Sequence, residues 1–290
     1  MRGESILVVE IARDESETMP RTALLGGGLP PVCRLGLATR GNTHLKCEDV
    51  ERAVGRGINY LNWCGHADGL SHAVARMGSA RKNVVVAAQF QARSAREAER
   101  EFASMIAELG TDSIDVLTLY YVESETEWEE IMAPGGVWDY LAEERRRGRL
   151  KRIGLTSHQR LLAAQWAESG KLDLLMIRYN ASHRGAEQDV FPVARQRNIP
   201  VVTFTGLRWK ALLRPTPDDP PGFSPPSAVD CYRFCLSHPD VTVALMAPGN
   251  RAELEDNLRL LDDWRAQEAA ARKQLMEHGD RVKKHAGAFW

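Results

Sequence analysis

Cysteine is scarce in this sequence of 290 residues, and its pattern excludes two kinds of architecture. The five cysteines are odd in number and never spaced C-x-x-C: Cys33, Cys47, Cys64, Cys231 and Cys235. We therefore expect no disulfide framework and no metal site. Cys231 and Cys235 lie four residues apart on an expected helix, a spacing open to metal or vicinal-thiol chemistry. Two small buried residues on one helix face are the favoured interpretation.

An excess of charge of one sign is also missing, since the formal net charge is −1 at pH 7. No basic stripe points to a nucleic-acid partner, and the three arginines at 145–147 fit a solvated helix face. No apolar stretch approaches the ~20 residues of a membrane span, and residues 1–19 lack the regions of a secretion signal. We expect a cytoplasmic protein with a small-molecule ligand and no nucleic-acid or membrane partner. The sequence does not indicate the oligomeric state.

Short apolar runs and amphipathic stretches alternate through the middle of the sequence. The runs expected to be strands cover residues 33–38, 57–62, 83–90, 114–120, 152–156, 172–177, 200–204 and 241–246. Their continuous apolar character is typical of parallel strands that are buried on both faces. The stretches expected to be helices cover residues 47–56, 70–77, 95–109, 128–147, 159–169, 187–197, 228–237 and 251–261.

Eight strands, each followed by a helix, predict an α/β fold of the (β/α)₈ TIM-barrel type. An open doubly wound sheet alternates in the same way, but its usual Gly-rich turn does not follow residues 35–38. We expect a single domain over residues 1–290, with the barrel at about 30–262 and a C-terminal helical tail at 263–290. Six prolines within residues 210–228 predict a loop on the C-terminal face, where the active sites of barrels lie.

Six short motifs follow one another in a family-specific order. They are the first-strand residues 21–26 and 32–38, GINYLNW at 57–63, LGTDSIDVLTL at 109–119, RGRLKRIGLTS at 147–157, RYN at 178–180 and NL at 257–258. In this order and at barrel spacing, from Arg21 to about Leu261, the sequence resembles the aldo-keto reductases. The resemblance implies an oxidoreductase barrel that binds a nicotinamide cofactor and interconverts carbonyls and alcohols.

Members of that family use an Asp, a Tyr, a Lys and a His at the barrel mouth. The Tyr donates a proton to the carbonyl oxygen, the Lys, paired with the Asp, lowers the pKa of the Tyr, and the His orients the substrate oxygen. The motifs place Asn62 at the Asp position, Gln89 at the Lys position and Tyr120 at the His position. The Tyr position falls on Asp68 or, with a weaker fit, on Ala67. All four catalytic residues are therefore replaced.

A substitute proton donor is needed for turnover, because the loss of a positioned acid lowers the rate by about 10²–10⁴-fold. Tyr120 ends the fourth strand, and it either donates the proton or fills space above the core. Tyr121, His66 and Asp68 are further candidates in the expected mouth. For His66, an exposed loop position is favoured over a catalytic role.

The resemblance also implies a site for NADP(H). Phe204 ends the seventh strand, where family members stack an aromatic residue on the nicotinamide. Thr156 and Ser157 stand where a Ser-Asn pair holds the carboxamide, and Met176 replaces the accompanying Gln.

The phosphates and the adenine of the cofactor have expected contacts too. Three residues after the seventh strand stand where family members touch the pyrophosphate: Thr205, Leu207 and Lys210. Gly249 precedes a helix whose free N–H groups and dipole predict an anion site. Arg251 is placed to reach a 2′-phosphate, which favours NADP over NAD, although a helix-surface charge is the alternative. Asn257 is placed to hold the adenine.

A polar cluster after the sixth strand, with one aromatic residue after the seventh, predicts a substrate site: Arg178, His183, Arg184 and Trp209. As a site, it favours an anionic or polar ligand bound by paired hydrogen bonds. As structure alone, it is a loop tied down by Glu187 and a turn at Asn180.

Three functions remain open at this point. The first is an NADP-dependent oxidoreductase with a reworked proton donor. The second is a catalytically silent NADPH-binding sensor or partner subunit. The third is a barrel that binds another ligand at its C-terminal face. Phe204 and Arg251 favour the first two functions over the third, and the replaced catalytic residues favour the second over the first. Membership of an enzyme family favours the first, although a fold does not prove a function.

Overall fold

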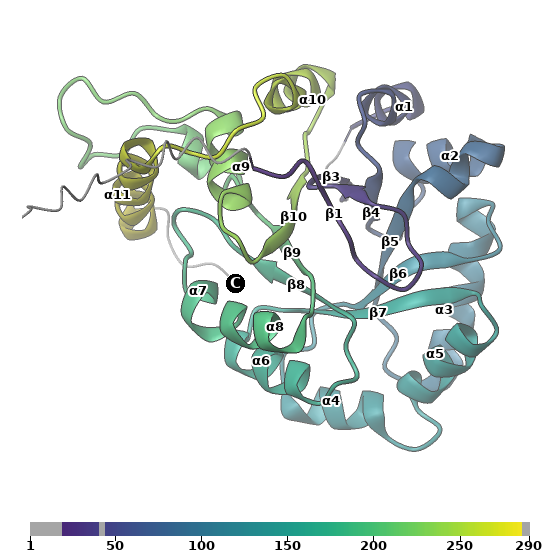
Figure 1. Ribbon diagram of the computed structural model, residues 1–290. Coiled ribbons are helices and arrows are strands. Elements are labelled where there is room, and N and C mark those ends of the chain that lie inside the picture. The colour runs from purple at the N-terminus through teal and green to yellow at the C-terminus, as the bar shows by residue number, and fades with distance from the viewer. Residues whose placement is uncertain (1–18, 41–43, 286–290) are drawn as a thin grey trace, which may run out of the picture.

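The computed structural model describes residues 19–40 and 44–285. Within these ranges, eight parallel strands follow one another around a closed barrel until the last pairs with the first (Figure 1). They are β3 (Leu35–Ala38), β4 (Tyr60–Trp63), β5 (Val85–Phe90), β6 (Ile114–Leu119), β7 (Leu150–Ser157), β8 (Leu174–Arg178), β9 (Val201–Phe204) and β10 (Val241–Met246). The predicted (β/α)₈ fold is confirmed. The predictions made for residues 1–18 and 286–290 lie outside the described residues.

The side chains of each strand alternate between the barrel interior and the surrounding helices. In β5, Val85 and Ala87 pack inside the barrel, whereas Val86 and Ala88 pack into the outer core. Because both faces are covered, these strands have no polar side and their sequences are continuous apolar runs. A residue that ends a strand in phase with the interior therefore faces the C-terminal mouth.

Helices surround the barrel and begin and end close to the predicted residues. They include α1 (Cys47–Gly55), α2 (Gly69–Arg76), α3 (Ala95–Leu109), α6 (Arg160–Glu168), α9 (Ala228–Leu236) and α10 (Arg251–Leu258). The sequence of α3 shows why its boundaries were predictable. Ser94 and Glu97 form a capping box at its start, and Gly110 ends it with a left-handed φ of 56°.

Two predicted helices are each broken into two. The stretch 128–147 contains the end of α4 (Glu125–Met132) and α5 (Val137–Arg146), because the sequence Pro-Gly-Gly at 134–136 intervenes and Gly135 adopts a φ of 71°. The stretch 187–197 is divided between α7 (Ala186–Asp189) and α8 (Phe191–Arg197), with a proline in the first turn of α8. The last turn predicted for α10 is a 3₁₀ helix, η3 (Arg259–Leu261).

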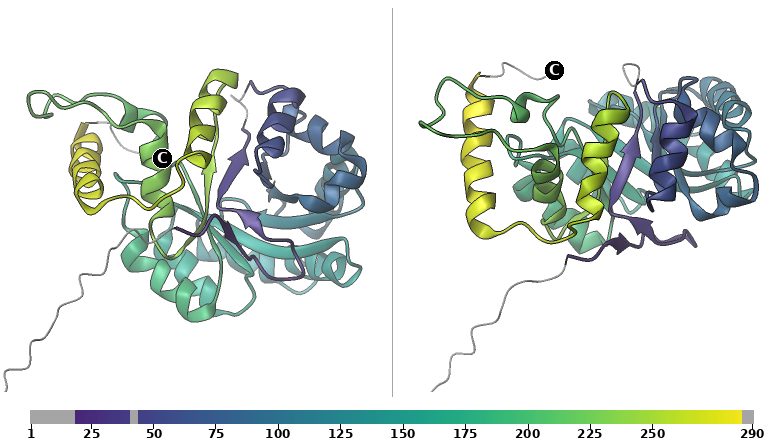
Figure 2. Two further views of the ribbon diagram at one scale, coloured as in Figure 1. Left: turned by 45° about the horizontal axis from the view of Figure 1, so that its top comes forward. Right: turned by 90° about the horizontal axis from the view of Figure 1, so that it is seen from above.

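The predicted strand at 33–38 is also two elements. Its start belongs to β2 (Val32–Cys33), which pairs antiparallel with β1 (Thr22–Ala23). Arg34 separates β2 from the barrel because its buried guanidinium turns aside to donate to the carbonyls of Leu236 and Val241, at 2.8 and 2.7 Å. The resulting hairpin lies at the end of the barrel opposite the mouth (Figure 2).

The C-terminal tail contains one further helix, α11 (Ala269–His285), which stands outside the barrel near α9 (Figure 2). It approaches the loop after β8 so closely that a Cβ added to Gly279 would lie 2.3 Å from the carbonyl oxygen of Ala181. The proline-rich segment is irregular over residues 210–227 apart from η2 (Ala211–Leu213), as predicted, and α9 begins at Ala228. Among the described residues, no helix is long and apolar enough to cross a membrane.

Candidate active site

A cavity of about 420 Å³ opens at the C-terminal mouth of the barrel. Ten residues predicted for the site line it: Asn62, Gln89, Tyr120, Tyr121, Met176, Phe204, Thr205, Leu207, Trp209 and Lys210. Strand alternation agrees with four of these positions. Asn62, Gln89, Met176 and Phe204 each follow, by two residues, a side chain of their own strand that packs inside the barrel. The family motifs had placed these residues at the mouth, and strand phase is the physical reason that their side chains face it.

Asn62 lies against this cavity with an unsatisfied amide. Its side chain is fully buried, and neither its oxygen nor its nitrogen has a hydrogen-bond partner among the described residues. The hydroxyl of Thr156, also fully buried, has none within the same part of the chain. A buried polar atom left unpaired costs about 1–3 kcal/mol, so such atoms usually have a partner. Asn62 beside an open cavity is therefore a group that a polar ligand would satisfy.

Tyr120 reaches the cavity as predicted, but its surroundings do not prepare it to donate a proton. Burial raises the pKa of its hydroxyl and Tyr121 raises it further, while Arg40 lowers it by less. The ring centroids of Tyr120 and Tyr121 lie 3.9 Å apart, with the planes tilted by 33°. The resemblance implies a lysine that makes the tyrosine of the family more acidic, whereas the net effect on Tyr120 is a raised pKa.

His158 is a cavity residue that the sequence analysis did not single out. Its ring stacks on Tyr121 at 4.3 Å and meets Phe204 edge-on at 6.1 Å. Its Nδ1 lies 3.2 Å from Oε1 of Glu123, and the same oxygen accepts its main-chain N–H at 2.9 Å. The signal in the sequence was its position, immediately after Ser157 at the end of the fifth barrel strand. Burial and Arg178 lower the pKa of His158, and Glu123 opposes them.

Asp68 and His66 do not line the mouth cavity, which corrects the placement of Asp68 and agrees with the exposed loop position favoured for His66. The carboxylate of Asp68 caps α2 by accepting the N–H groups of Leu70 and Ser71, each at 2.9 Å. His66 is exposed, and its carbonyl accepts the indole N–H of Trp63 at 2.7 Å. A loop residue has no strand phase, so the motif alignment could not place its side chain.

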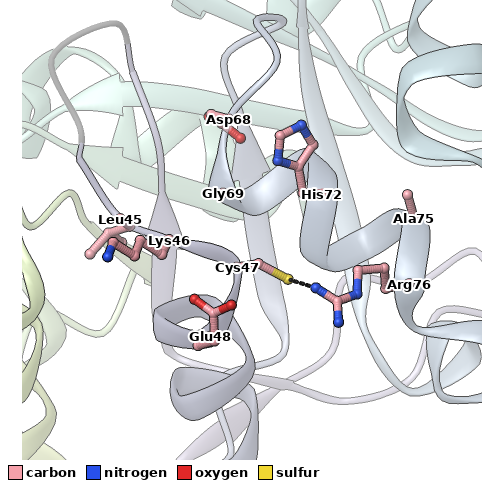
Figure 3. Close-up of a pocket in the computed structure, with 9 residues that line it drawn as sticks. All are labelled: Leu45, Lys46, Cys47, Glu48, Asp68, Gly69, His72, Ala75 and Arg76. Carbon is pink, nitrogen blue, oxygen red and sulfur yellow. Dashed lines mark hydrogen bonds between the residues drawn. The ribbon is translucent and has the colours of Figure 1, made fainter.

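Asp68 instead lines a second cavity of about 630 Å³ between α1 and α2 (Figure 3). Cys47 faces it, with Sγ 3.5 Å from a guanidinium nitrogen of Arg76 and donating to Glu51 at 3.3 Å. Burial and Glu51 raise the pKa of this thiol, so Cys47 is held as a thiol and is a poor nucleophile. His72 also lines this cavity, which is separate from the mouth.

The residues predicted to hold the nicotinamide surround the end of β7. Phe204 and Met176 are on the cavity wall. Thr156 and Ser157 are buried, and the Ser157 hydroxyl accepts the N–H of Gln159 at 3.0 Å.

The loop that follows β9 has an unusual backbone. Four of its residues have positive φ although none is glycine: Thr205 at 61°, Arg208 at 45°, Trp209 at 52° and Lys210 at 69°. Such conformations cost free energy and concentrate at ligand sites. This loop forms one side of the cavity entrance, where Trp209 is 60% exposed.

The predicted anion site at the start of α10 already holds a carboxylate. Glu253 accepts the N–H of Gly249 at 2.9 Å and the ammonium of Lys210 at 2.5 Å. The main-chain N–H of Gly249 is therefore already bonded within the chain. Arg251 is exposed and paired with Asp49, and Asn257 is almost fully buried. The cofactor contacts predicted for these residues stay predictions.

His183 and Arg184, two of the predicted substrate residues, bind different partners. His183 accepts a hydrogen bond from Arg208 at its Nε2, at 2.9 Å, and burial, with Arg208 and then Arg178, lowers its pKa to about 3. His183 is therefore neutral at ordinary pH. Arg184 instead pairs with Asp280 of α11 at 2.8 Å. Arg184 therefore holds the terminal helix, which corrects its predicted placement in the substrate site. Buried Arg208 was missed because the sequence does not show which way its loop turns.

Comparison with known families gives a match over most of the chain. The model described as the aldo/keto reductase family matches residues 35–230. No curated protein matches the sequence.

Solved structures extend the likeness to the whole barrel. An aldo-keto reductase from Klebsiella pneumoniae in complex with NADPH has a TM-score of 0.72 and 18% identity, over 90% of this chain and 96% of that one. The holo form of the aldo-keto reductase AKR11C1 from Bacillus halodurans has a TM-score of 0.72 and 16% identity, over 89% and 96%. The glycerol dehydrogenase AKR11B4 from Gluconobacter oxydans has a TM-score of 0.69 and 16% identity, over 93% and 98%. At these identities the likeness shows the fold.

Proposed function

Because the chain belongs to the aldo/keto reductase family, we propose that it is an NADP(H)-binding oxidoreductase that acts on a carbonyl or the corresponding alcohol at the barrel mouth. The observation that carries the proposal is the mouth cavity, where Asn62 presents an unsatisfied amide and Phe204 an aromatic ring. A nicotinamide has a flat ring and a polar carboxamide, and these side chains complement both. The complex of the Klebsiella pneumoniae relative with NADPH supports this choice of cofactor.

Different residues of this chain bind different parts of the cofactor. Phe204 packs against the nicotinamide ring, and Thr156 and Ser157 hold its carboxamide. Lys210 and Arg251 supply positive charge for the phosphates of the cofactor once these two side chains separate from their carboxylate partners. When bound, the cofactor supplies a hydride to a carbonyl carbon or accepts one from an alcohol.

A catalytically silent NADPH-binding protein is the second candidate. It is favoured by one observation, the raised pKa of Tyr120, which makes this candidate substitute a poor replacement for the proton donor of the family. A barrel repurposed for another ligand is the third candidate. It is favoured by the carboxylate of Glu253 at the start of α10.

Tryptophan fluorescence separates the third candidate from the first two. Trp209 lines the cavity and is exposed, so bound NADPH is expected to quench its fluorescence. The quenching should saturate, and the Kd for NADPH should be lower than the Kd for NADH. Phe204→Ala should weaken NADPH binding by about three- to tenfold through loss of ring packing. Leu161→Ala is the matched control, because Leu161 is a 72% exposed apolar residue on α6.

Two outcomes decide the proposal. Trp209→Phe should remove most of the fluorescence change while calorimetry still detects binding, which would locate the cofactor at the mouth. No binding of NADPH or NADH at millimolar concentration would overturn both the oxidoreductase and the silent binding protein.

A further inference from the structure

Glu123 and His158 meet at the rim of the mouth cavity from neighbouring barrel strands. Glu123 follows β6 and His158 follows β7. The loop after β6 is fixed to β7 because the N–H of Val122 donates to the carbonyl of Thr156 at 3.1 Å. The N–H of Glu123 donates to the Glu127 carboxylate at 2.7 Å, which holds this residue at the start of α4. The carboxylate of Glu123 therefore approaches the imidazole from a fixed position.

The structure assigns His158 as the proton donor and acceptor of this barrel, with Glu123 as its positioning residue. This assignment rests on the proposed function. The Glu123 carboxylate, 3.2 Å from Nδ1, favours the proton on that nitrogen. Nε2 lies on the opposite side of the ring, where no hydrogen-bond partner exists within residues 19–40 and 44–285. It is therefore open to a substrate oxygen in the cavity that His158 lines.

Tyr121 keeps the imidazole in this orientation. Its backbone has a φ of 47°, a left-handed conformation that an aromatic residue rarely adopts. This conformation places its ring between those of Tyr120 and His158, at 3.9 and 4.3 Å. The strain is accounted for if the stacked ring is needed to fix the imidazole. Phe204 meets the imidazole edge-on at 6.1 Å, which connects His158 to the ring expected to pack against the cofactor.

The chemistry of His158 suits the task better than that of Tyr120. An imidazole changes its protonation closer to neutral pH than a phenol does, even where burial and Arg178 lower its pKa, as in His158. Burial and Tyr121 raise the pKa of the Tyr120 hydroxyl still further from that range. During carbonyl reduction, the carbonyl carbon accepts a hydride and the carbonyl oxygen accepts the proton of Nε2–H. The imidazolium becomes a neutral imidazole and takes up a proton from water, while the nicotinamide ends oxidised. Alcohol oxidation follows the reverse course, with neutral Nε2 as the acceptor.

Two charged groups act on His158 in opposite directions. Burial and the Arg178 guanidinium lower its pKa, while the Glu123 carboxylate raises it. The only other titratable ring against the imidazole in the described chain is that of Tyr121. Removal of Glu123 should therefore lower the pKa of His158, and removal of Arg178 should raise it. A purely structural role for His158 would not connect these two shifts to turnover.

The test compares Glu123→Gln, Arg178→Gln and His158→Gln with the wild-type chain. NMR titration of the imidazole in the cofactor-free protein measures the pKa of His158 without any reaction. Reduction of 4-nitrobenzaldehyde with NADPH, an electron-poor aldehyde as probe, gives kcat against pH. Fluorescence titration measures NADPH affinity separately in each variant. His72→Gln, which removes an exposed histidine of α2 outside the mouth, is the control.

We expect the alkaline limb of kcat for reduction, where the imidazolium loses its proton, to move to lower pH in Glu123→Gln and to higher pH in Arg178→Gln, together with the NMR pKa. His158→Gln should lower kcat by about 10²-fold or more while the Kd for NADPH changes little. Turnover that keeps its rate and pH profile in His158→Gln would overturn the assignment. So would NADPH binding with no turnover in the wild-type chain, although the cofactor site would stand. Absence of NADPH binding would instead overturn the proposed function itself.

Discussion

The carboxylate of Glu253 joins the ammonium of Lys210, at 2.5 Å, to the main-chain N–H of Gly249, at 2.9 Å. It thus occupies two groups that the family resemblance assigns to cofactor phosphates. Burial raises the pKa of Glu253, but Lys210 and the N–H of Gly249 more than offset this effect, so the carboxylate stays ionised. A phosphate that approaches α10 must therefore displace an internal anion.

Glu253→Gln should consequently tighten NADPH binding. The change removes one negative charge and releases Lys210, and charge effects at a helix N-terminus correspond to about three- to tenfold in Kd. Fluorescence titration at low ionic strength measures the effect. Glu255→Gln is the matched control, because Glu255 lies on the same helix and pairs with Arg52 away from Lys210. An unchanged Kd would mean that no phosphate group comes near Gly249.

Asn62→Leu should raise stability and lower ligand affinity at the same time. Leucine has a similar size and removes a fully buried amide that has no partner among the described residues, which should raise the free energy of unfolding by about 1–3 kcal/mol. Urea unfolding of the cofactor-free protein measures this gain. With saturating NADPH the gain in unfolding free energy should be smaller, because the variant lacks the amide to which the ligand would hydrogen-bond. A less stable variant without ligand would show that Asn62 is already satisfied, for example by water.

Gly279→Ala should detach α11 from the barrel. A Cβ at this position would lie 2.3 Å from the carbonyl oxygen of Ala181, and the contact is to backbone, which cannot move aside cheaply. The ion pair between Arg184 and Asp280 should weaken with it. Limited proteolysis should then cleave before α11 faster than in the wild-type chain. Glu277→Ala, at an exposed position of the same helix, controls for the added alanine. Equal cleavage rates would contradict the close approach.

The sequence predicted the barrel because the fold depends on periodicity, and the family motifs predicted most of the mouth residues. Each strand between two covered faces is an apolar run, and its phase determines which last residue faces the cavity, as for Gln89 and Phe204. The break within 128–147 was visible as Pro-Gly-Gly but was outweighed by the helical pattern on both sides. This boundary was thus lost where a local signal opposed a longer periodic one, whereas the break at Arg34 depends on hydrogen bonds to the distant residues Leu236 and Val241.

The chemistry of the site was less predictable because it depends on contacts between distant segments. Nothing in the sequence places Glu123 beside His158, since 35 positions separate them and the contact arises from the pairing of β6 with β7. Asp68 was placed by alignment of a loop, where no strand phase constrains the side chain. Glu253 lies within the helix predicted at 251–261, and only the structure shows that its carboxylate bonds back to the N–H of Gly249, four residues earlier.

His183→Gln should make the protein less sensitive to mild acid. The pKa of His183 is lowered to about 3 in the folded chain by burial, Arg208 and Arg178, against ~6.5 when unfolded. As pH falls from ~6.5 towards 3, the unfolded state therefore binds a proton that the folded state does not, and stability is lost. Urea unfolding at pH 7 and pH 5 should show a smaller loss for His183→Gln than for the wild-type chain. His72→Gln, an exposed histidine, should lose as much stability as the wild-type chain. If His183→Gln lost as much, His183 would have to accept a proton in the folded state, which its contact with the Arg208 guanidinium opposes.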